Sequence, residues 1–284
     1  MKALIAKCKQ YYRWCKLKRK IIRFLKKDPH YNDPEIAEIV GFLKRNHLTE
    51  FPYDFVKRYD FKKIIVHTDL DNGLKYVLHD NKRLYFARVL SEDTIRRAYT
   101  GLLRDQDIDS PHRYETPDFH VNEGDVVVDA GSAEGNFALS VVEKVKKIYL
   151  FEVNEHWIEA LKATFAPWKD KVEIVCKYVS DNDGDNCVAL DTFFGKDKID
   201  FIKADIEGAE LALVKGSRNI LSGNDKLKVI LCTYHNADDA QQLESMLTES
   251  GFKTEFSKGY MIFRHDRTLD EPYLRKGLIR GRKV

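Results

Sequence analysis

Residues 125–139 constrain the fold of this chain more than any other segment. They read Asp-Val-Val-Val-Asp-Ala-Gly-Ser-Ala-Glu-Gly-Asn-Phe-Ala-Leu, a β-branched run that ends in an acid and is followed by two glycines and an apolar helical pattern. This order predicts a strand, a tight loop and a helix at the carboxyl edge of a parallel sheet, where nucleotides bind. Gly131 and Gly135 would let the backbone turn and approach a ligand, and the free amides near Asn136 would bind its anionic group.

The spacing and charge of this loop favour a methyl donor over a dinucleotide. The glycines are spaced G-x-x-x-G rather than G-x-G-x-x-G, and Asp129 precedes the first of them. A carboxylate at that position repels a pyrophosphate but attracts the cationic amino-acid end of S-adenosylmethionine. We therefore expect Asp129 and the loop residue Glu134 to contact this cofactor.

Strands and helices alternate from Val121 onward, which is typical of an α/β fold with a parallel sheet. The pattern predicts strands at residues 126–129, 148–152, 172–176, 201–205 and 229–234. A hairpin of residues 252–256 and 260–264 would supply a reversed last strand. Four segments are expected: a basic helical segment (1–50), a small antiparallel β meander with a connecting helix (51–118), the cofactor-binding domain (119–266) and a basic tail (267–284).

Polar residues follow each predicted strand, and the carboxyl ends of parallel strands share one edge of the sheet. Glu152 lies 23 residues after Asp129 and would accept the ribose hydroxyls, and Asp181 would meet the adenine. Asp205 closes a buried run and needs a partner, and His235 follows the fifth strand. Three of these residues also have a purely structural alternative. Glu152 would be a solvated strand end, Asp181 would form a turn, and His235 would lie next to a helix N-cap.

Residues 199–210, Ile-Asp-Phe-Ile-Lys-Ala-Asp-Ile-Glu-Gly-Ala-Glu, are the most specific part of a family resemblance. With this stretch, the chain resembles the FkbM family of S-adenosylmethionine-dependent methyltransferases from about Ser110 to Arg264. The resemblance implies the class I methyltransferase sheet and, as the usual activity, methylation of hydroxyls on sugars of glycans or natural products. It implies a carbohydrate or glycolipid acceptor.

Methyl transfer to a sugar hydroxyl requires loss of the hydroxyl proton, and a positioned base would assist it. We expect His235 and Asp205 to supply that base. Alternatively, Asp205, Glu207 and His235 would hold a divalent cation that orients the acceptor. Glu210 lies inside a predicted helix, where a structural role is the simpler expectation.

The charge is concentrated at the N-terminus. Residues 1–27 hold 11 Lys or Arg and no acid, whereas the other 257 residues carry a net charge of −8. This helix would either pack with its basic face in solvent, or lie on an anionic membrane, or grip RNA phosphates. An RNA methyltransferase, a non-catalytic nucleoside-binding protein and a nicotinamide enzyme stay open as alternatives, although the acidic main domain argues against nucleic acid.

The sequence has neither a signal peptide pattern nor a long apolar span, and its five cysteines form no C-x-x-C pair. These features predict a cytoplasmic protein with reduced thiols, in peripheral contact with the inner face of the membrane if the basic helix binds lipid.

Overall fold

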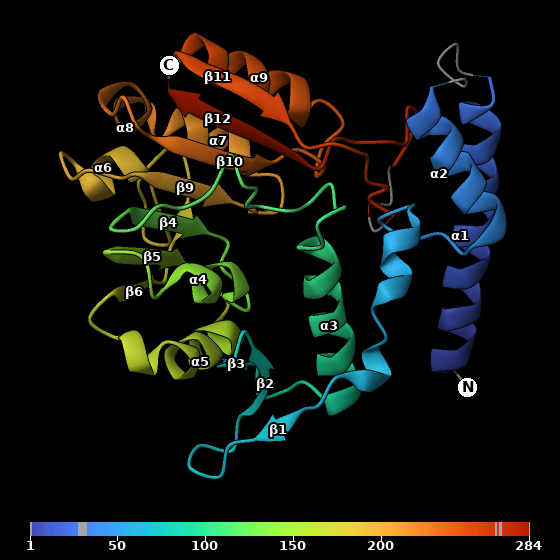
Figure 1. The fold of residues 1–284 in the computed structure, drawn as a ribbon, viewed down its shortest axis with the longest axis horizontal. Coiled ribbons are helices and arrows are strands. Elements are labelled where there is room, and N and C mark those ends of the chain that lie inside the picture. Colours follow the sequence, from blue (N-terminus) through green and yellow to red (C-terminus); the bar gives the residue numbers. More distant parts are fainter. Residues whose placement is uncertain (1, 28–32, 265, 267–268, 284) are drawn as a thin grey trace.

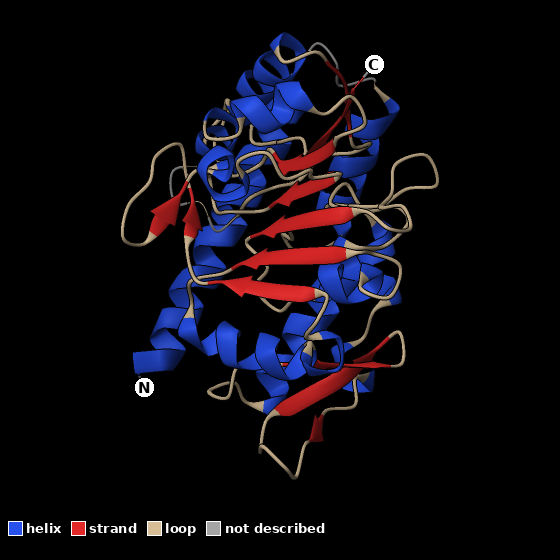
Figure 2. Ribbon diagram, turned by 90° about the vertical axis from the view of Figure 1, so that its left-hand side faces the viewer, coloured by secondary structure: helices blue, strands red, loops and turns tan. Residues whose placement is uncertain are grey.

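A seven-stranded, mostly parallel sheet forms the centre of the molecule (Figures 1 and 2). The computed structural model describes residues 2–27, 33–264, 266 and 269–283, and only the backbone of residues 2–8. The strands of the sheet are β4 (Val126–Ala130), β5 (Lys147–Phe151), β6 (Val172–Val175), β9 (Phe201–Ala204), β10 (Lys228–Cys232), β11 (Phe252–Phe256) and β12 (Leu278–Lys283). Their order is β11-β12-β10-β9-β4-β5-β6, and β12 runs antiparallel to both of its neighbours. The predicted fold class is confirmed.

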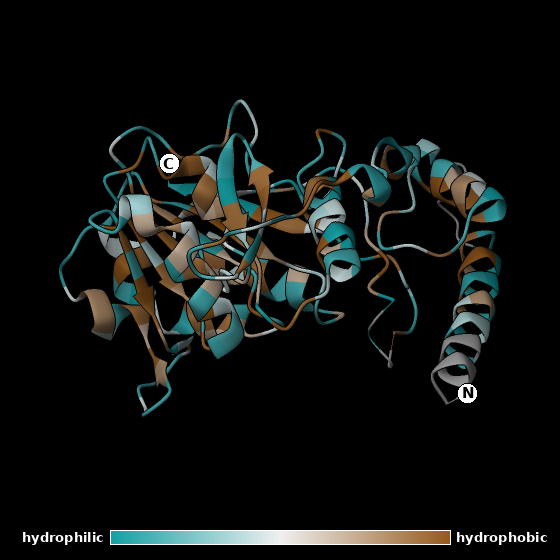
Figure 3. Ribbon diagram, turned by 90° about the horizontal axis from the view of Figure 1, so that it is seen from below, coloured by the Kyte–Doolittle hydropathy of each residue, from teal (hydrophilic) through white to brown (hydrophobic). Residues whose placement is uncertain are grey.

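Helices cover both faces of this sheet, because successive strand residues alternate between two apolar cores. In β5, for example, Ile148 and Leu150 belong to one core and Phe151 to the other. The first core is covered by α4 (Asn136–Val141) and α5 (Glu155–Thr164), and the second by α6 (Leu190–Phe194), α7 (Glu210–Lys215), α8 (Arg218–Gly223) and α9 (Asp239–Glu249). Figure 3 shows the hydrophobic residues concentrated in the strands between these layers.

The N-terminal part adds the predicted helices and small antiparallel sheet. Its elements are α1 (Lys2–Leu25), α2 (Pro34–Arg45), the short 3-10 helices η1 (Asp54–Arg58) and η2 (Phe61–Lys63), the three-stranded sheet β1 (His67–Thr68), β2 (Lys75–His79) and β3 (Lys82–Tyr85), and α3 (Glu92–Asp105). Asp33 caps α2, since its carboxylate accepts the amide hydrogen of Glu35 at 2.8 Å. A 3-10 turn, η3 (Ala166–Trp168), and the parallel pair β7 (Tyr178–Val179) and β8 (Cys187–Val188) complete the elements.

Helix α1 packs against α2 through Ile21 and Leu25, which are buried in the same core as the first face of the sheet. Lys18 donates to the carbonyl of Asn46 at the end of α2, at 3.0 Å, where the helix dipole favours a cation. The N-terminal segment is thus joined to the main sheet by one continuous core. In the described part of the chain, no helix combines the length and apolar character needed to cross a membrane.

The predicted C-terminal hairpin is wrong. The partner of β11 is β12, which pairs Phe252 with Lys283 and Phe256 with Ile279, whereas Met261 forms only an isolated bridge with Arg275. The expected basic tail therefore enters the sheet between β10 and β11. Sequence reasoning missed β12 because Arg280 and its basic neighbours resemble a solvated tail. Arg280 is in fact buried and donates to the carbonyl of Arg113 at 2.6 Å.

Candidate active site

A cavity of about 490 Å³ opens at the carboxyl edge of the sheet, where the strand–loop–helix pattern predicts a nucleotide site. Its wall is built from the ends of β4, β5, β7 and β9 and the first turn of α5. The lining residues are Gly131, Ala133, Phe151, Glu152, Val153, Asn154, Trp157, Lys177, Tyr178, Val179, Ser180, Cys187, Asp205, Ile206, Glu207 and Ala209. The cavity is therefore mostly apolar, with a few carboxylates at defined places.

Glu152 is held rigidly at the rim of this cavity. One carboxylate oxygen accepts the amide hydrogen of Ala133 at 3.0 Å, and the other accepts those of Val153 and Asn154, both at 2.8 Å. Three amides from two loops thus fix the carboxylate, and one lone-pair site, on Oε2, remains for a hydroxyl donor. This geometry fits the predicted contact with a ribose hydroxyl.

The two glycines of the loop have positive φ angles, 72° at Gly131 and 79° at Gly135, so the predicted tight turn is present. The close approach, however, is made to the chain itself. A Cβ at Gly131 would lie 2.0 Å from the carbonyl oxygen of Asp205, and one at Gly135 would lie 2.7 Å from Leu161 in α5. Of the two, only Gly131 lines the cavity.

Asp129 lies behind the loop rather than in the cavity. Its side chain is 1% exposed, and one carboxylate oxygen lies 2.9 Å from the Nζ of Lys203, which is itself 5% exposed. Lys203 also donates to the carbonyl of Gly131 at 2.9 Å. The cation that Asp129 was expected to attract is therefore a lysine of the neighbouring strand, and Asp129 is not open to a cofactor here.

The other predicted cofactor residues surround the cavity without forming its wall. Asn136 is the first residue of α4, and burial raises the pKa of the half-buried Glu134. Asp181 is exposed, and its neighbour Ser180 is the residue that lines the cavity. Contacts of these three side chains with a cofactor remain predictions.

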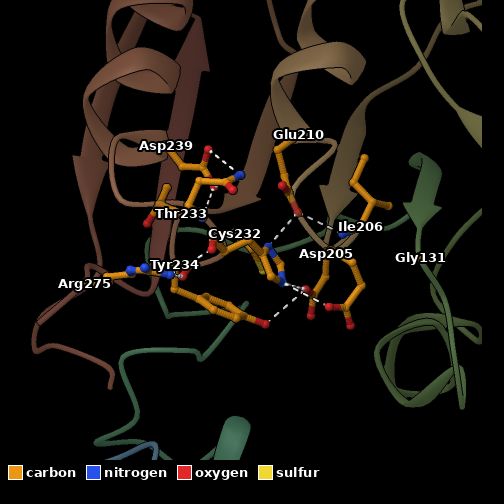
Figure 4. A network of polar contacts seen from close by, with 12 residues as sticks. Gly131, Asp205, Ile206, Glu210, Cys232, Thr233, Tyr234, Asp239 and Arg275 are labelled. Atoms are coloured by element: carbon orange, nitrogen blue, oxygen red, sulfur yellow. Dashed lines mark hydrogen bonds and ion pairs between the residues drawn. The ribbon is translucent and has the colours of Figure 1, made fainter. Parts of the chain in front are cut away.

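Asp205 connects the cavity to a buried polar network (Figure 4). Its carboxylate accepts the hydroxyl hydrogens of Tyr114 at 2.9 Å and Tyr234 at 3.1 Å. The Nε2 atoms of His112 and His235 lie 3.6 and 3.5 Å from it. Burial alone would raise the pKa of Asp205, but the two histidines and Lys203 outweigh burial and hold the pKa at about 2. Asp205 is thus ionised at any physiological pH.

His235 stands between two carboxylates. Its Nδ1 lies 3.1 Å from the Oε1 of Glu210, and its Nε2 faces Asp205 and the exposed Glu207, whose carboxylate is 3.9 Å away. Burial disfavours the imidazolium, but Glu210 and Asp205 outweigh it and raise the pKa of His235. Glu210 is fully buried, and its Oε1 also accepts the amide hydrogen of Ile206 at 2.8 Å. The structure therefore brings the predicted pair Asp205 and His235 together.

Of the three candidates for a divalent cation, Asp205 and His235 lie 3.5 Å apart, whereas Glu207 is exposed and approaches His235 only to 3.9 Å. Asp205 has four polar neighbours, and Glu210 occupies the Nδ1 side of His235. A metal ligand histidine must be neutral, whereas these carboxylates raise the pKa of His235. Among the described residues, Glu210 rather than Glu207 completes the group with Asp205 and His235 whose ligand atoms all lie within 4.8 Å of one another.

Sequence reasoning missed several members of this network. Lys203 lies inside an apolar run, and His112 and Tyr114 lie outside the predicted strands and helices of the main domain. His112 is buried with Nε2 3.5 Å from the Sγ of Cys232, and burial lowers the pKa of His112 to about 4. The Ser-Pro-His-Arg-Tyr sequence was the available signal, but its place in the site depends on tertiary packing.

Comparisons with known proteins identify methyltransferases among the proteins that this chain is similar to. Residues 179–254 match the model of the methyltransferase FkbM domain. The methyltransferase FkbM from Methylobacillus flagellatus KT is 18% identical, with a TM-score of 0.46 over 69% of this chain and 56% of that chain, so this chain spans little more than half of that protein. The precorrin-6y C5,15-methyltransferase from Geobacter metallireducens GS-15 is 12% identical, with a TM-score of 0.43 over 73% of this chain and 97% of that chain.

A putative methyltransferase from Streptococcus mutans, solved in complex with SAH, is 13% identical, with a TM-score of 0.40 over 58% of this chain and 91% of that chain. No curated protein matches the chain. The domain match begins at the end of β7, ends within β11 and includes the predicted signature at residues 199–210. It confirms the resemblance predicted from the sequence: residues 179–254 of this chain match the model of the methyltransferase FkbM domain.

Proposed function

We propose that this protein is an S-adenosylmethionine-dependent methyltransferase that methylates a hydroxyl group, with a sugar of a glycan or glycoconjugate as the acceptor. One observation carries the proposal: Asp205 lines the cavity and is at the same time held against His235, 3.5 Å away. A cofactor cavity and an acid–base pair thus share one carboxylate. The sugar acceptor rests on the family resemblance alone.

The cavity has the character expected for the cofactor. Phe151, Trp157 and Tyr178 provide apolar and aromatic surface for an adenine, and Glu152 provides two carboxylate oxygens fixed by backbone amides. Binding sites for small molecules commonly combine such apolar walls with a few oriented polar groups. When bound, S-adenosylmethionine would supply an activated methyl group, so the protein needs mainly to position the acceptor and remove its proton.

Different residues of the network would position the acceptor and remove its proton. Asp205, which stays ionised, would accept a hydrogen bond from the acceptor hydroxyl and orient it. Glu210, whose Oε1 lies 3.1 Å from Nδ1 of His235, would favour the tautomer with its hydrogen on Nδ1 and leave Nε2, on the Asp205 side, as the basic nitrogen. His235 Nε2 would then receive the hydroxyl proton. A divalent cation is not needed in this scheme, because the protein already supplies the orienting and accepting groups.

Cofactor binding can be tested without knowledge of the acceptor. Calorimetry with S-adenosylhomocysteine should give binding to the wild-type protein, and Glu152→Gln should weaken it about 10- to 100-fold, because a charged acceptor of hydrogen bonds is lost. Glu123→Gln, a matched change at an exposed carboxylate outside the cavity, should leave the affinity unchanged. Absence of binding by the wild-type protein would contradict the proposal.

The acceptor requires a second measurement. Glycans or glycolipids incubated with the protein and S-adenosylmethionine should gain the mass of one methyl group, and His235→Ala should lower this turnover at least tenfold. Equal turnover in His235→Ala would remove His235 from the mechanism. Methylation of RNA instead of carbohydrate would overturn the acceptor assignment.

A further inference from the structure

One surface of the protein plays no part in the proposed chemistry: the outer side of α1. Six basic residues recur along it and the turn that follows it at alternating spacings of four and three, and together we call them the basic stripe: Lys9, Arg13, Lys16, Lys20, Arg23 and Lys27. At 100° per residue these side chains fall within about 80° of one another around the helix axis. All six are exposed.

The opposite side of the helix is the one that packs. Ile21 and Leu25 are buried in the core, and Trp14 is partly buried beneath the Arg264 guanidinium at 4.4 Å. The basic stripe is therefore displayed outward by a helix that is anchored along its inner side. Figure 1 shows α1 at the side of the molecule away from the central sheet, with α2 beside it.

The charge of the stripe is largely uncompensated. Among the described residues, none of its six side chains forms an ion pair, and only Arg13 has a hydrogen bond, to the carbonyl of Asp266 at 3.2 Å. Asp270 and Glu271 share a shallow hollow with the C-terminal half of the stripe. Two carboxylates against six cations leave a net positive surface about 27 Å long.

We propose that the basic stripe is a docking surface for an anionic lipid bilayer. Exposed Tyr12, at 72%, flanks the stripe and would lie at the level of the headgroups, where aromatic side chains are favoured. A polyanion such as RNA would extend past the helix and meet the remainder of the chain, whose net charge is −8. A bilayer contacts only the outer face of α1, so this repulsion is weaker for lipid than for RNA.

The basic stripe is also connected to the candidate active site through a series of side-chain contacts. Arg264, which stacks on Trp14 of α1, also pairs with Glu50 at 3.1 Å. The adjacent Phe263 ring lies 5.5 Å from the ring of His235. Docking through α1 would therefore hold the site at a fixed distance from the lipid surface, which suits an acceptor presented there.

Sedimentation of the full-length protein with vesicles tests this proposal. We expect binding to vesicles of phosphatidylcholine with phosphatidylserine at low salt, release at high salt, and none to phosphatidylcholine alone. Each basic side chain near the surface contributes roughly fivefold to such partitioning. The variant Lys9→Gln/Lys16→Gln/Lys20→Gln should thus bind on the order of 100-fold more weakly, and each single variant about fivefold.

The matched control carries the same change at three exposed lysines elsewhere: Lys146, Lys169 and Lys196. It should bind like the wild type. Equal loss in the control, or no sedimentation of the wild type with anionic vesicles, would overturn the proposal. If the wild-type protein does not bind vesicles but shifts RNA in a gel, and the triple variant does not shift it, the ligand of the basic stripe is RNA and not lipid. Binding of S-adenosylhomocysteine by all these variants serves as the check on folding.

Discussion

The contact between Glu210 and His235 makes the sharpest prediction about catalysis. At 3.1 Å, a carboxylate and an imidazolium attract each other by about 5 kcal/mol at an effective dielectric constant of about 20. This figure is an upper limit, because burial opposes both charges. An opposite charge at such a distance commonly moves a titration by roughly one to three pH units. Glu210→Gln removes the charge and preserves the size of the side chain.

In the proposed mechanism only neutral His235 accepts a proton, so kcat/KM should rise with pH through the raised pKa of His235. In Glu210→Gln this acid limb should move to lower pH by roughly one to three pH units. The maximal rate should fall, because a weaker base accepts the proton. The assay is the pH profile of kcat/KM, together with an NMR titration of the His235 ring, which reports the same change without turnover.

Glu207→Gln is the matched control for this experiment. Glu207 is 89% exposed and lies 3.9 Å from His235 Nε2, so solvent screens its charge and the limb should move by at most about 0.7 pH unit. Affinity for S-adenosylhomocysteine should stay unchanged in Glu210→Gln, because Glu210 does not line the cavity. If folded Glu210→Gln shows neither a shift in the acid limb of the kcat/KM profile nor a shift in the NMR titration of His235, Glu210 does not raise the pKa of His235.

Three further predictions concern stability. Gly131→Ala should lower the unfolding free energy by at least about 1–3 kcal/mol, because its Cβ would meet the Asp205 carbonyl at 2.0 Å; an unchanged Tm would contradict this. Lys203→Met should cost about 3–5 kcal/mol by leaving Asp129 buried and unpaired, and adding Asp129→Leu should recover much of it; no recovery would show that the ion pair is not the cause. The pKa of His112, lowered by burial to about 4, lies below its unfolded value, so the unfolded chain binds the extra proton. Stability should therefore fall by up to about 3 kcal/mol as pH drops from about 6.5 to 4, and denaturation of His112→Gln should show that much less pH dependence.

The strand ends of the site could be predicted from the sequence. The alternation of β-branched runs with helical periods indicated a parallel sheet, and in such a sheet the carboxyl ends must share an edge. This rule alone placed Glu152, Asp205 and His235 near one another, and the structure brings Asp205 and His235 together and sets Glu152 at the rim of the same cavity. These signals are local, because each strand and the acid that closes it are adjacent in the chain.

What tertiary structure decided was the pairing of residues distant in sequence. Asp129 was expected to bind the cationic end of a ligand. In the structure the parallel pairing of β4 and β9 places Lys203 beside Asp129, and the two form an ion pair. The last strand of the sheet was predicted directly after β11. In the structure a long loop separates β11 from β12, and β12 lies between β11 and β10. Sequence patterns report which face of an element is apolar. They do not report which distant charge will neutralise a buried one, because that depends on strand register and on the packing of the whole core.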